Sequence, residues 1–360
     1  MVVNHLELFA GIGGFRQALD LVCGDFGLES KNIGFSEIDP NATNTYKANF
    51  DTSDEVEIGD IVSFAHKRSN IRGLSDFNFL TGGFPCQSFS MMGKQNGFND
   101  MRGNVFFQIL EIIKIKKPKF ILLENVKNIL THNKGETFKV VTESIKDLGY
   151  PYLYYDVFNS RDFSIAQNRN RVYIFATKSK LNDEFKFSSK DVSGCFNKIS
   201  PHTSLVQSKY TFEILEKNVD KKYYLSEVIK PTILADGAKN FQSKSTIDQV
   251  IARPLTATMV KMHRACQDNY FSDDFIQSDD PGEYSKRVFT KDELIKKNIR
   301  KLTPKEAFLL QGFNTTFYEN AKKKGTSDSQ LYKQAGNAVT VNTVYAIFYY
   351  LLVENNIMGE

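Results

Sequence analysis

The chain has 360 residues, a hydrophobic fraction of 41% and a formal net charge of +4. This length accommodates one large and one smaller domain, each with its own core. The small net charge gives no bulk basicity for binding nucleic acid, so any contact with nucleic acid would have to come from local groups of basic side chains. We recognise no signal peptide and no apolar run of about 18 residues, and therefore expect a cytoplasmic protein without a membrane span.

The cysteines and histidines do not suggest a metal centre. The cysteines, at positions 23, 86, 195 and 266, lack the paired spacing of metal ligands, and the five histidines are scattered. No metal site is predicted. Thiols in a cytoplasmic protein stay reduced, which suits a catalytic cysteine.

The first predicted strand, residues 4–9, leads into Gly11-Ile12-Gly13-Gly14 and then into a helical pattern over residues 15–22. Glycines at such a turn let the backbone approach a ligand. Taken alone the turn is a weak signal that suits a nicotinamide site equally well, although Arg16 stands where the G-x-G-x-x-G pattern has its third glycine.

Two further predicted strands end in carboxylates. Residues 33–36 precede Glu37-Ile38-Asp39, and residues 55–58 precede Gly59-Asp60-Ile61. An acid at the end of the second strand is placed to bind two ribose hydroxyls, which indicates Glu37. Asp60 is expected beside an adenine amino group.

The next strand, residues 77–81, ends in two glycines followed by Phe84-Pro85-Cys86. Ligands of open α/β sheets bind at the carboxyl ends of strands, so Cys86 is a candidate nucleophile at the mouth of a cleft. The alternative is a small buried hydrophobic residue in a loop, as free cysteines often are.

A polar, glycine-containing stretch over residues 91–104 has no periodicity and is interpreted as a mobile loop, with a simple surface loop as the alternative. A helix is predicted over residues 105–116, with Ile109, Ile112 and Ile113 on its buried face.

Residues 119–123 form another short apolar strand that runs into Glu124-Asn125-Val126. If this strand lies beside residues 77–81 in one parallel sheet, Glu124 and Cys86 meet at the same edge, where the carboxyl group can exchange a proton. The alternative for Glu124 is an N-cap at a strand-to-helix turn.

Residues 251–265 contain four basic side chains and no acid, namely Arg253, Lys261, His263 and Arg264. This patch is interpreted as a DNA contact, with a solvated loop as the alternative. Residues 253–259 are strand-like. Thr303-Pro304-Lys305-Glu306 is a strong helix start, and residues 339–353 form an apolar terminal helix whose aromatic residues are expected in the core.

Six motifs in order resemble those of the DNA cytosine-C5 methyltransferases, in particular the bacterial restriction-modification type. The resemblance covers residues 5–179 and 300–353 and rests on Leu8-Phe9-Ala10-Gly11-Ile12-Gly13-Gly14-Phe15, Pro85-Cys86-Gln87, Glu124-Asn125-Val126, Gln167-Asn168-Arg169-Asn170-Arg171, Arg300-Lys301-Leu302-Thr303-Pro304-Lys305-Glu306-Ala307 and Gln334-Ala335-Gly336-Asn337-Ala338-Val339. Pro254-Leu255-Thr256-Ala257 also resembles a short signature of the family's recognition domain.

The resemblance implies an α/β fold, with a doubly wound, Rossmann-like domain that binds S-adenosylmethionine and a smaller target-recognition domain. The expected catalytic domain is discontinuous, over residues 1–185 and 325–360, and residues 186–324 are expected to form the recognition domain and hinge.

The implied reaction transfers a methyl group to C5 of a cytosine that has been flipped out of double-stranded DNA. The residues implied in catalysis are Cys86, which adds to C6, Glu124 at N3, Arg171 at O2, Arg169, which orders the site, and Asn125. A water near Cys86 and Asn125 is the hypothesis for removal of the C5 proton.

The residues implied in cofactor binding are Phe9, Gly11, Gly13, Gly14, Glu37, Ile38, Asp60, Ile61, Pro85, Asn337 and Ala338. The family often has an aromatic residue where this chain has Ile38, which weakens the expected packing on adenine. The alternative for Phe9 is a core aromatic at the end of a strand.

The residues expected to contact DNA are Gln87, Ser90, Arg102, Arg253, Thr256, Lys261 and Arg264. We expect a monomer that associates with the bacterial nucleoid through DNA and that is paired in function with a restriction endonuclease without a stable complex. The expected role is protection of host DNA.

Three alternatives remain open. An RNA cytosine methyltransferase shares the chemistry, but such proteins usually carry Cys-Phe-Thr where this chain has Cys195-Phe196-Asn197. A catalytically silent DNA-binding module is disfavoured by intact Cys86, Glu124 and Arg171. A nicotinamide oxidoreductase is disfavoured by the missing third glycine.

Overall fold

The computed structural model describes residues 2–85, 105–237 and 243–359, and these divide into two compact units. The first unit comprises residues 1–159, 170–204 and 343–360, and the second comprises residues 160–169 and 205–342. Each unit is described by itself.

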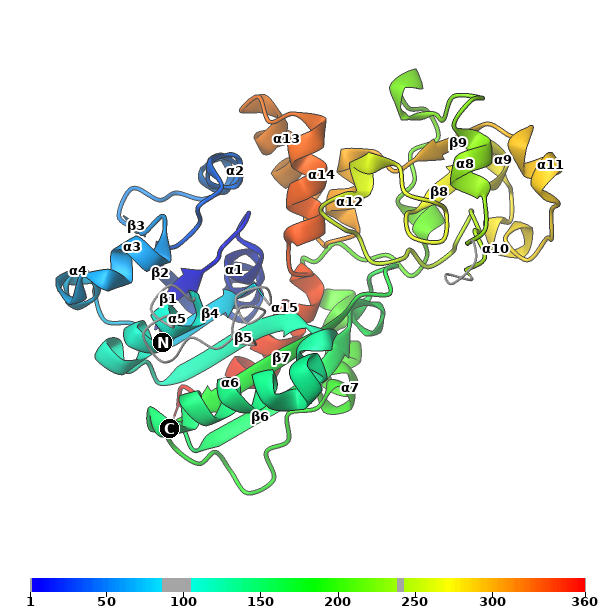
Figure 1. The fold of residues 1–360 in the computed structure, drawn as a ribbon. Coiled ribbons are helices and arrows are strands. Elements are labelled where there is room, and N and C mark those ends of the chain that lie inside the picture. The colour runs from blue at the N-terminus through cyan, green and yellow to red at the C-terminus, as the bar shows by residue number, and fades with distance from the viewer. Residues whose placement is uncertain (1, 86–104, 238–242, 360) are drawn as a thin grey trace. The chain divides into compact units, whose positions relative to one another are not determined.

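In the first unit, seven strands of the described chain form one sheet in the order β3-β2-β1-β4-β5-β7-β6 (Figure 1). The strands are β1 (Val2–Leu8), β2 (Glu29–Phe35), β3 (Val56–Glu57), β4 (Phe79–Gly83), β5 (Phe120–Val126), β6 (Tyr152–Asn159) and β7 (Asn170–Thr177). Strands β1 to β5 run parallel to one another, whereas β7 is antiparallel to both β5 and β6. The predicted adjacency of the fourth and fifth strands is therefore confirmed.

Helices cover both faces of this sheet. The helices of the first unit and its border are α1 (Gly14–Phe26), α2 (Pro40–Asn49), α3 (Ile61–His66), α4 (Arg68–Gly73), α5 (Val105–Lys116), α6 (Glu136–Asp147), α7 (Ser189–Ile199) and α15 (Val341–Phe348). One face packs a core of aliphatic strand residues against α3, α4, α5 and α6, and Ile109, Ile112 and Ile113 are fully buried there, as predicted. On the other face the rings of Phe79 and Phe348 meet at 5.4 Å. The doubly wound α/β fold is confirmed.

The short 3-10 turns and the chain end complete this unit. The 3-10 segments are η3 (Lys127–Leu130), η4 (His132–Gly135) and η6 (Ser200–His202), and a π-helical turn, η10 (Tyr349–Glu354), follows α15. The aromatic residues of the terminal helix are buried, which confirms their prediction as core residues. The helical stretch Asp328–Glu354 is long and apolar enough to cross a membrane, but 89% of its most apolar window is buried inside the protein, as in a core helix.

The second unit has short elements and a small core. Its helices are α8 (Lys230–Leu234), α9 (Asp273–Gln277), α10 (Pro281–Tyr284), α11 (Lys291–Ile295), α12 (Pro304–Leu309), α13 (Thr315–Lys323) and α14 (Asp328–Asn337), its 3-10 turns are η5 (Ser160–Phe163), η7 (Thr211–Glu213), η8 (Lys221–Tyr223) and η9 (Met259–Lys261), and its strands are β8 (Tyr270–Ser272) and β9 (Ile299–Lys301). Strands β8 and β9 pair antiparallel. Thr303 and Glu306 form the capping box that begins α12, with Pro304 in the first turn, as predicted.

The strand-like prediction for residues 253–259 is wrong. Distant side chains, rather than a neighbouring strand, bind the backbone here: Asn269 accepts the N–H of Arg253 at 2.8 Å, and Gln167 accepts the N–H of Leu255 at 2.8 Å. Pro254 has no N–H to donate. The segment is irregular until η9 begins at Met259.

Candidate functional site

The glycine loop lies between β1 and α1 and requires glycine at Gly13. Both Gly11 and Gly13 have positive φ angles, +57° and +89°. A Cβ atom on Gly13 would lie 2.4 Å from the ring of Phe50 and 2.9 Å from the ring of Tyr46, so no larger residue fits without displacing them. Nothing lies within 4 Å of a Cβ on Gly11, which leaves open space on that side of the loop.

Glu37 joins the glycine loop to the end of β2. Its Oε2 accepts the N–H of Gly11 at 2.8 Å, and its Oε1 accepts the N–H groups of Ile38 and Asp39 at 2.9 and 2.8 Å. Three backbone donors thus fix the carboxylate at the carboxyl end of the sheet. Beside it, Ile38 is 72% exposed, which is unusual for an apolar side chain of this size.

The remaining cofactor candidates of the first unit also gather around the ends of the parallel strands. Asp60 is the N-cap of α3, and its hydrogen bond from the Ser63 hydroxyl holds the pKa of Asp60 below its ordinary value. Ile61, the first residue of α3, is buried, while Phe9 is half-buried, packs against the core and has a φ of 54°. Pro85 is exposed after β4.

A buried carboxylate below the glycine loop was missed by the sequence reading. Glu7 of β1 is fully buried and accepts the N–H of Phe15 at 3.2 Å, while the hydroxyl of Tyr46 lies 3.2 Å from its other oxygen. Burial raises the pKa of Glu7 to about 8. Arg16 approaches Tyr46 at 3.3 Å and pairs with Glu55 at 2.6 Å. The alternation of polar and apolar residues in β1 would have assigned Glu7 to an exposed face, whereas both faces of this strand are buried. The groups that bind Glu7 come from distant positions, and no local signal marks them.

At the carboxyl end of β5 the structure brings Glu124 and Arg171 together. The Nε of Arg171 lies 2.9 Å from Oε1 of Glu124, and the two side chains are 19% and 11% exposed. Glu124 lies within β5, so it is not an N-cap. A Cβ on Gly83, the register partner of Glu124 in β4, would come within 3.0 Å of the carboxylate, so glycine leaves room for it.

Asn125 connects the end of β5 to the segment that precedes Cys86. Its side-chain amide donates to the carbonyl of Phe84 at 2.8 Å, and its Oδ1 accepts the N–H of Val126 at 2.8 Å. Asn125 is 2% exposed, and its hydrogen bond to Phe84 is buried. The bond fixes the backbone two residues before Cys86.

The remaining catalytic and DNA-contacting candidates near the fourth strand, Cys86, Gln87, Ser90 and Arg102, lie outside the described residues, as does the predicted loop over residues 91–104.

Arg169 lies in the second unit and is 3% exposed. Its guanidinium donates to the carbonyls of Leu255, Gly336 and Ala338 at 2.8, 3.1 and 2.9 Å. Within this unit Arg169 therefore ties the end of α14 to the segment that contains Leu255. The cofactor candidates Asn337, which is exposed, and Ala338, which is buried, belong to the same unit.

The DNA candidates of the second unit differ in exposure. Thr256 and Lys261 are exposed, and half-buried Arg264 donates to the carbonyl of Asp236 at 3.0 Å. Arg253 is half-buried, bonds the hydroxyl of Thr246 at 2.6 Å, and has a pKa lowered by burial.

These motifs were compared with known proteins. The family model described as C-5 cytosine-specific DNA methylase matches residues 3–352. The chain belongs to this family.

Curated relatives of the chain are methyltransferases. It is 37% identical to the type II methyltransferase M1.ScrFI of Lactococcus lactis subsp. cremoris over 95% of this chain and 76% of that protein. It is 35% identical to the type II methyltransferase M.SsoII of Shigella sonnei over 95% of this chain and 78% of that protein. It is 30% identical to the orphan methyltransferase M.SPRI of Bacillus phage SPR over 95% of this chain and 96% of that protein. The chain is thus a C5 cytosine DNA methyltransferase of the restriction-modification type.

Solved structures with this fold include the Entamoeba histolytica methyltransferase EhMeth, with a TM-score of 0.72 and 22% identity over 98% of this chain and 99% of that one. The S. pombe Dnmt2 methyltransferase has a TM-score of 0.69 and 20% identity over 98% of this chain and 99% of that one. These likenesses agree with a Rossmann-like methyltransferase fold. The described part of the chain has no group of three or more His, Cys, Asp or Glu side chains that could hold a metal ion.

Proposed function

We propose that this methyltransferase transfers a methyl group from S-adenosylmethionine to C5 of a flipped-out cytosine within a short specific sequence of double-stranded DNA, through a covalent Cys86 adduct. The observation that carries the proposal is the pairing of Glu124 with Arg171 at the carboxyl end of β5. Atoms N3 and O2 are neighbours on one edge of cytosine, so a carboxyl group and a guanidinium in contact match that edge.

In the proposed reaction the Cys86 thiolate forms a bond to C6, and the electron pair of the C5–C6 double bond shifts into the C4–C5 bond, so that negative charge develops at N3. Glu124 stabilises or protonates N3 as charge develops there, and Arg171 hydrogen-bonds O2. C5 can then attack the methyl group that S-adenosylmethionine would supply, and the methyl–sulfur bond would break with its electron pair left on sulfur. Finally a base removes the C5 proton, the double bond returns and the Cys86 thiolate leaves. A water near Asn125 is the candidate base.

The residues of the glycine loop and the sheet edge fit S-adenosylmethionine. Glu37 is a carboxylate held at the end of the second strand, the open space at Gly11 admits a ligand, and exposed Ile38 offers an apolar surface for adenine. The cofactor, when bound, supplies the methyl group on a sulfonium. Asp60 is the proposed partner of the adenine amino group, although its carboxylate also caps α3.

Further residues are proposed to form the walls of the cofactor site. Phe9, Gly11, Gly13, Gly14, Ile61 and Pro85 surround the strand ends of the first unit, and Asn337 and Ala338 of the second unit are proposed to close the methionine end. Arg169 is proposed to act as a positioning residue, since its guanidinium is engaged by backbone carbonyls.

The proposed DNA contacts combine phosphate and base recognition. Lys261, Arg264 and Arg102 are proposed to contact phosphates, and Thr256, Gln87, Ser90 and Arg253 to lie at the DNA interface. Flipping the cytosine costs a few kcal/mol of stacking and pairing.

The proposed biological role is protection of host DNA from a cognate restriction endonuclease, by a cytoplasmic monomer that forms no stable complex with it and associates with the nucleoid through DNA. We also propose a catalytic domain over residues 1–185 and 325–360 and a recognition domain over residues 186–324. The compact units support a discontinuous arrangement, although residues 186–204 lie in the first unit and residues 325–342 in the second.

The test is incubation of the protein with radiolabelled S-adenosylmethionine and, in parallel, duplex DNA and transfer RNA, with Cys86→Ala as the control. We expect Cys86-dependent 5-methylcytosine in DNA at one short repeated sequence. Label confined to RNA would overturn the substrate, and DNA binding without label in either nucleic acid would favour a silent binding module.

A further inference from the structure

Residues 256–264, here called the recognition turn, present polar side chains at the surface of the second unit. Thr256, Thr258 and Lys261 are exposed, and His263 and Arg264 are half-buried. The turn contains η9, and its backbone bends sharply at Met262, which has a φ of 51°. A non-glycine residue in this region is strained, and surrounding structure has to hold it there.

The start of the turn is fixed by side chains from distant positions. The N–H of Leu255 donates to Gln167 and its carbonyl accepts from Arg169, both at 2.8 Å. The next peptide is packed so closely on Gly336 that a Cβ there would lie 2.2 Å from the carbonyl carbon of Thr256. These contacts therefore fix the backbone conformation at the start of the recognition turn.

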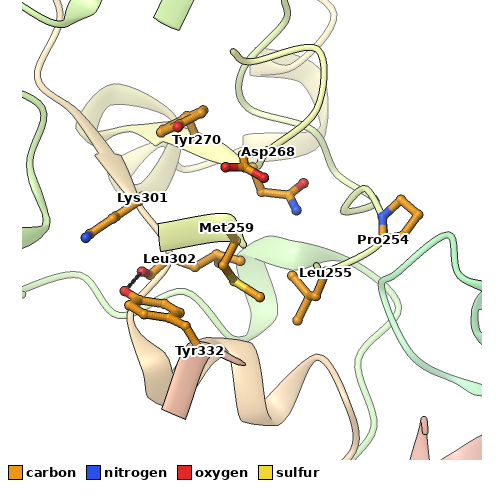
Figure 2. A pocket seen from close by; sticks show the side chains of 9 residues that line it. Pro254, Leu255, Met259, Asp268, Tyr270, Lys301, Leu302 and Tyr332 are labelled. Carbon is orange, nitrogen blue, oxygen red and sulfur yellow. Dashed lines mark hydrogen bonds between the residues drawn. The ribbon is translucent and has the colours of Figure 1, made fainter. Parts of the chain in front are cut away.

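The end of the turn is fixed in the same way. The N–H of His263 donates to Asp268 at 3.1 Å, and the hydroxyl of Tyr270 donates to the carbonyl of His263 at 2.7 Å. Figure 2 shows Asp268 and Tyr270 with Met259 around a pocket of about 20 Å³, which has room for about one water molecule. Met262 packs against the core of the unit.

A chain of polar atoms runs across this fixed backbone. The hydroxyl oxygens of Thr256 and Thr258 are 3.4 Å apart, and the hydroxyl of Thr258 lies 3.1 Å from Nε2 of His263. A hydroxyl and an imidazole each donate and accept hydrogen bonds, which matches the mixed donor and acceptor pattern of base edges. Because these side chains hold each other in one rotamer, they lose little conformational entropy when they bind a ligand.

We infer that Thr258 and His263 form a base-reading pair that determines the identity of one base pair in the target site. The inference deepens the proposed function and rests on it, because it requires that the second unit binds duplex DNA. Lys261 and Arg264 lie on the same turn and supply the positive charge that suits phosphate contacts. The Thr258 hydroxyl and the His263 ring on the same turn are suited to recognition of a base, whereas Lys261 and Arg264 are suited to affinity.

The test uses Thr258→Val, which keeps the shape but removes the hydroxyl, and His263→Phe, which keeps a ring but removes both nitrogens. His202→Phe is the matched control, since His202 is an exposed histidine outside the recognition turn. Each protein methylates a library of duplexes with randomised sequence, the methylated sites are sequenced, and DNA binding is measured over a range of salt concentrations.

We expect each of the two variants to lose about tenfold or more of the discrimination at one and the same base pair, with the other positions and the salt dependence unchanged. The control should keep the wild-type target sequence. Uniformly weaker binding with a salt slope reduced by about one would identify a phosphate contact and overturn the inference, as would an unchanged target sequence in both variants. Absence of DNA methylation by the wild-type protein would instead remove the proposed function, and the inference with it.

Discussion

Arg171 of β7 and Glu124 of β5 meet through one hydrogen-bonded ion pair, with Nε and Oε1 2.9 Å apart, where β5 ends. Both side chains are mostly shielded from water, so each stabilises the charge of the other. The strands are antiparallel, and both residues belong to the first unit.

Removal of the arginine is expected to impair both stability and catalysis. Arg171→Ala leaves a largely buried carboxylate without its partner, which should cost about 1–3 kcal/mol of stability and lower kcat by at least tenfold, because the proposed contact with O2 is lost. Arg171→Lys keeps the charge but not the planar fork, so it should restore stability better than kcat. Steady-state kinetics and urea unfolding of both variants measure the two effects. Equal loss of kcat in both variants with no change in stability would contradict a structural contribution of the pair.

The tight packing at Gly336 gives a second prediction. A Cβ at this position would lie 2.2 Å from the carbonyl carbon of Thr256 and 2.3 Å from the nitrogen of Ala257, and backbone atoms cannot move aside cheaply. Gly336→Ala should therefore destabilise the protein by about 1–3 kcal/mol. Gly24→Ala is the control, since a Cβ there meets nothing within 4 Å and alanine in a helix should add about 0.5–1 kcal/mol. Urea unfolding that ranks the two variants the other way would be incompatible with the close approach.

Local patterns predicted the features that depend on local chemistry. The helix α5 and the capping box of Thr303 and Glu306 occur where the sequence indicated them, because periodic apolar residues and cap side chains act over a few positions. The strand ends that carry Glu37 and Glu124 also followed from apolar runs and the rule that ligands bind at carboxyl edges.

The features that the sequence did not predict depend on distant partners. Arg253 and Leu255 donate their N–H groups to Asn269 and Gln167, so β-propensity could not reveal that no strand forms. Glu7 is buried below the glycine loop because Tyr46 and the start of α1 supply its donors. A single sequence does not encode such pairings in any local spacing.

The bond between Asn125 and Phe84 leads to a prediction about the covalent step. Asn125→Ala removes the donor to the Phe84 carbonyl, so the segment leading to Cys86 loses a fixed point. Formation of the Cys86 adduct with DNA that contains 5-fluorocytosine should slow by about tenfold, because misplacement of a nucleophile by about 1 Å is costly. Asn125→Asp, which removes the donor but preserves volume, should show the same defect. Normal adduct formation on this DNA, together with slow loss of the adduct on DNA that contains ordinary cytosine and therefore a removable C5 proton, would instead support the water near Asn125 as the base.

The buried carboxyl of Glu7 should make stability fall as the pH rises. Its pKa is about 8 in the folded protein and about 4.5 in an unfolded chain, so the folded state holds more protons between these values and stability is lost as the pH rises through 8. Burial lowers the pKa of His5 to about 3, which acts in the opposite direction only below about pH 6.5, so the window from pH 6.5 to 8 isolates Glu7. In that window urea unfolding should show a decrease of up to about 1.4 kcal/mol per pH unit. Glu7→Gln, which cannot ionise, should flatten the profile, whereas an equally steep profile in this variant would assign the titration to another group.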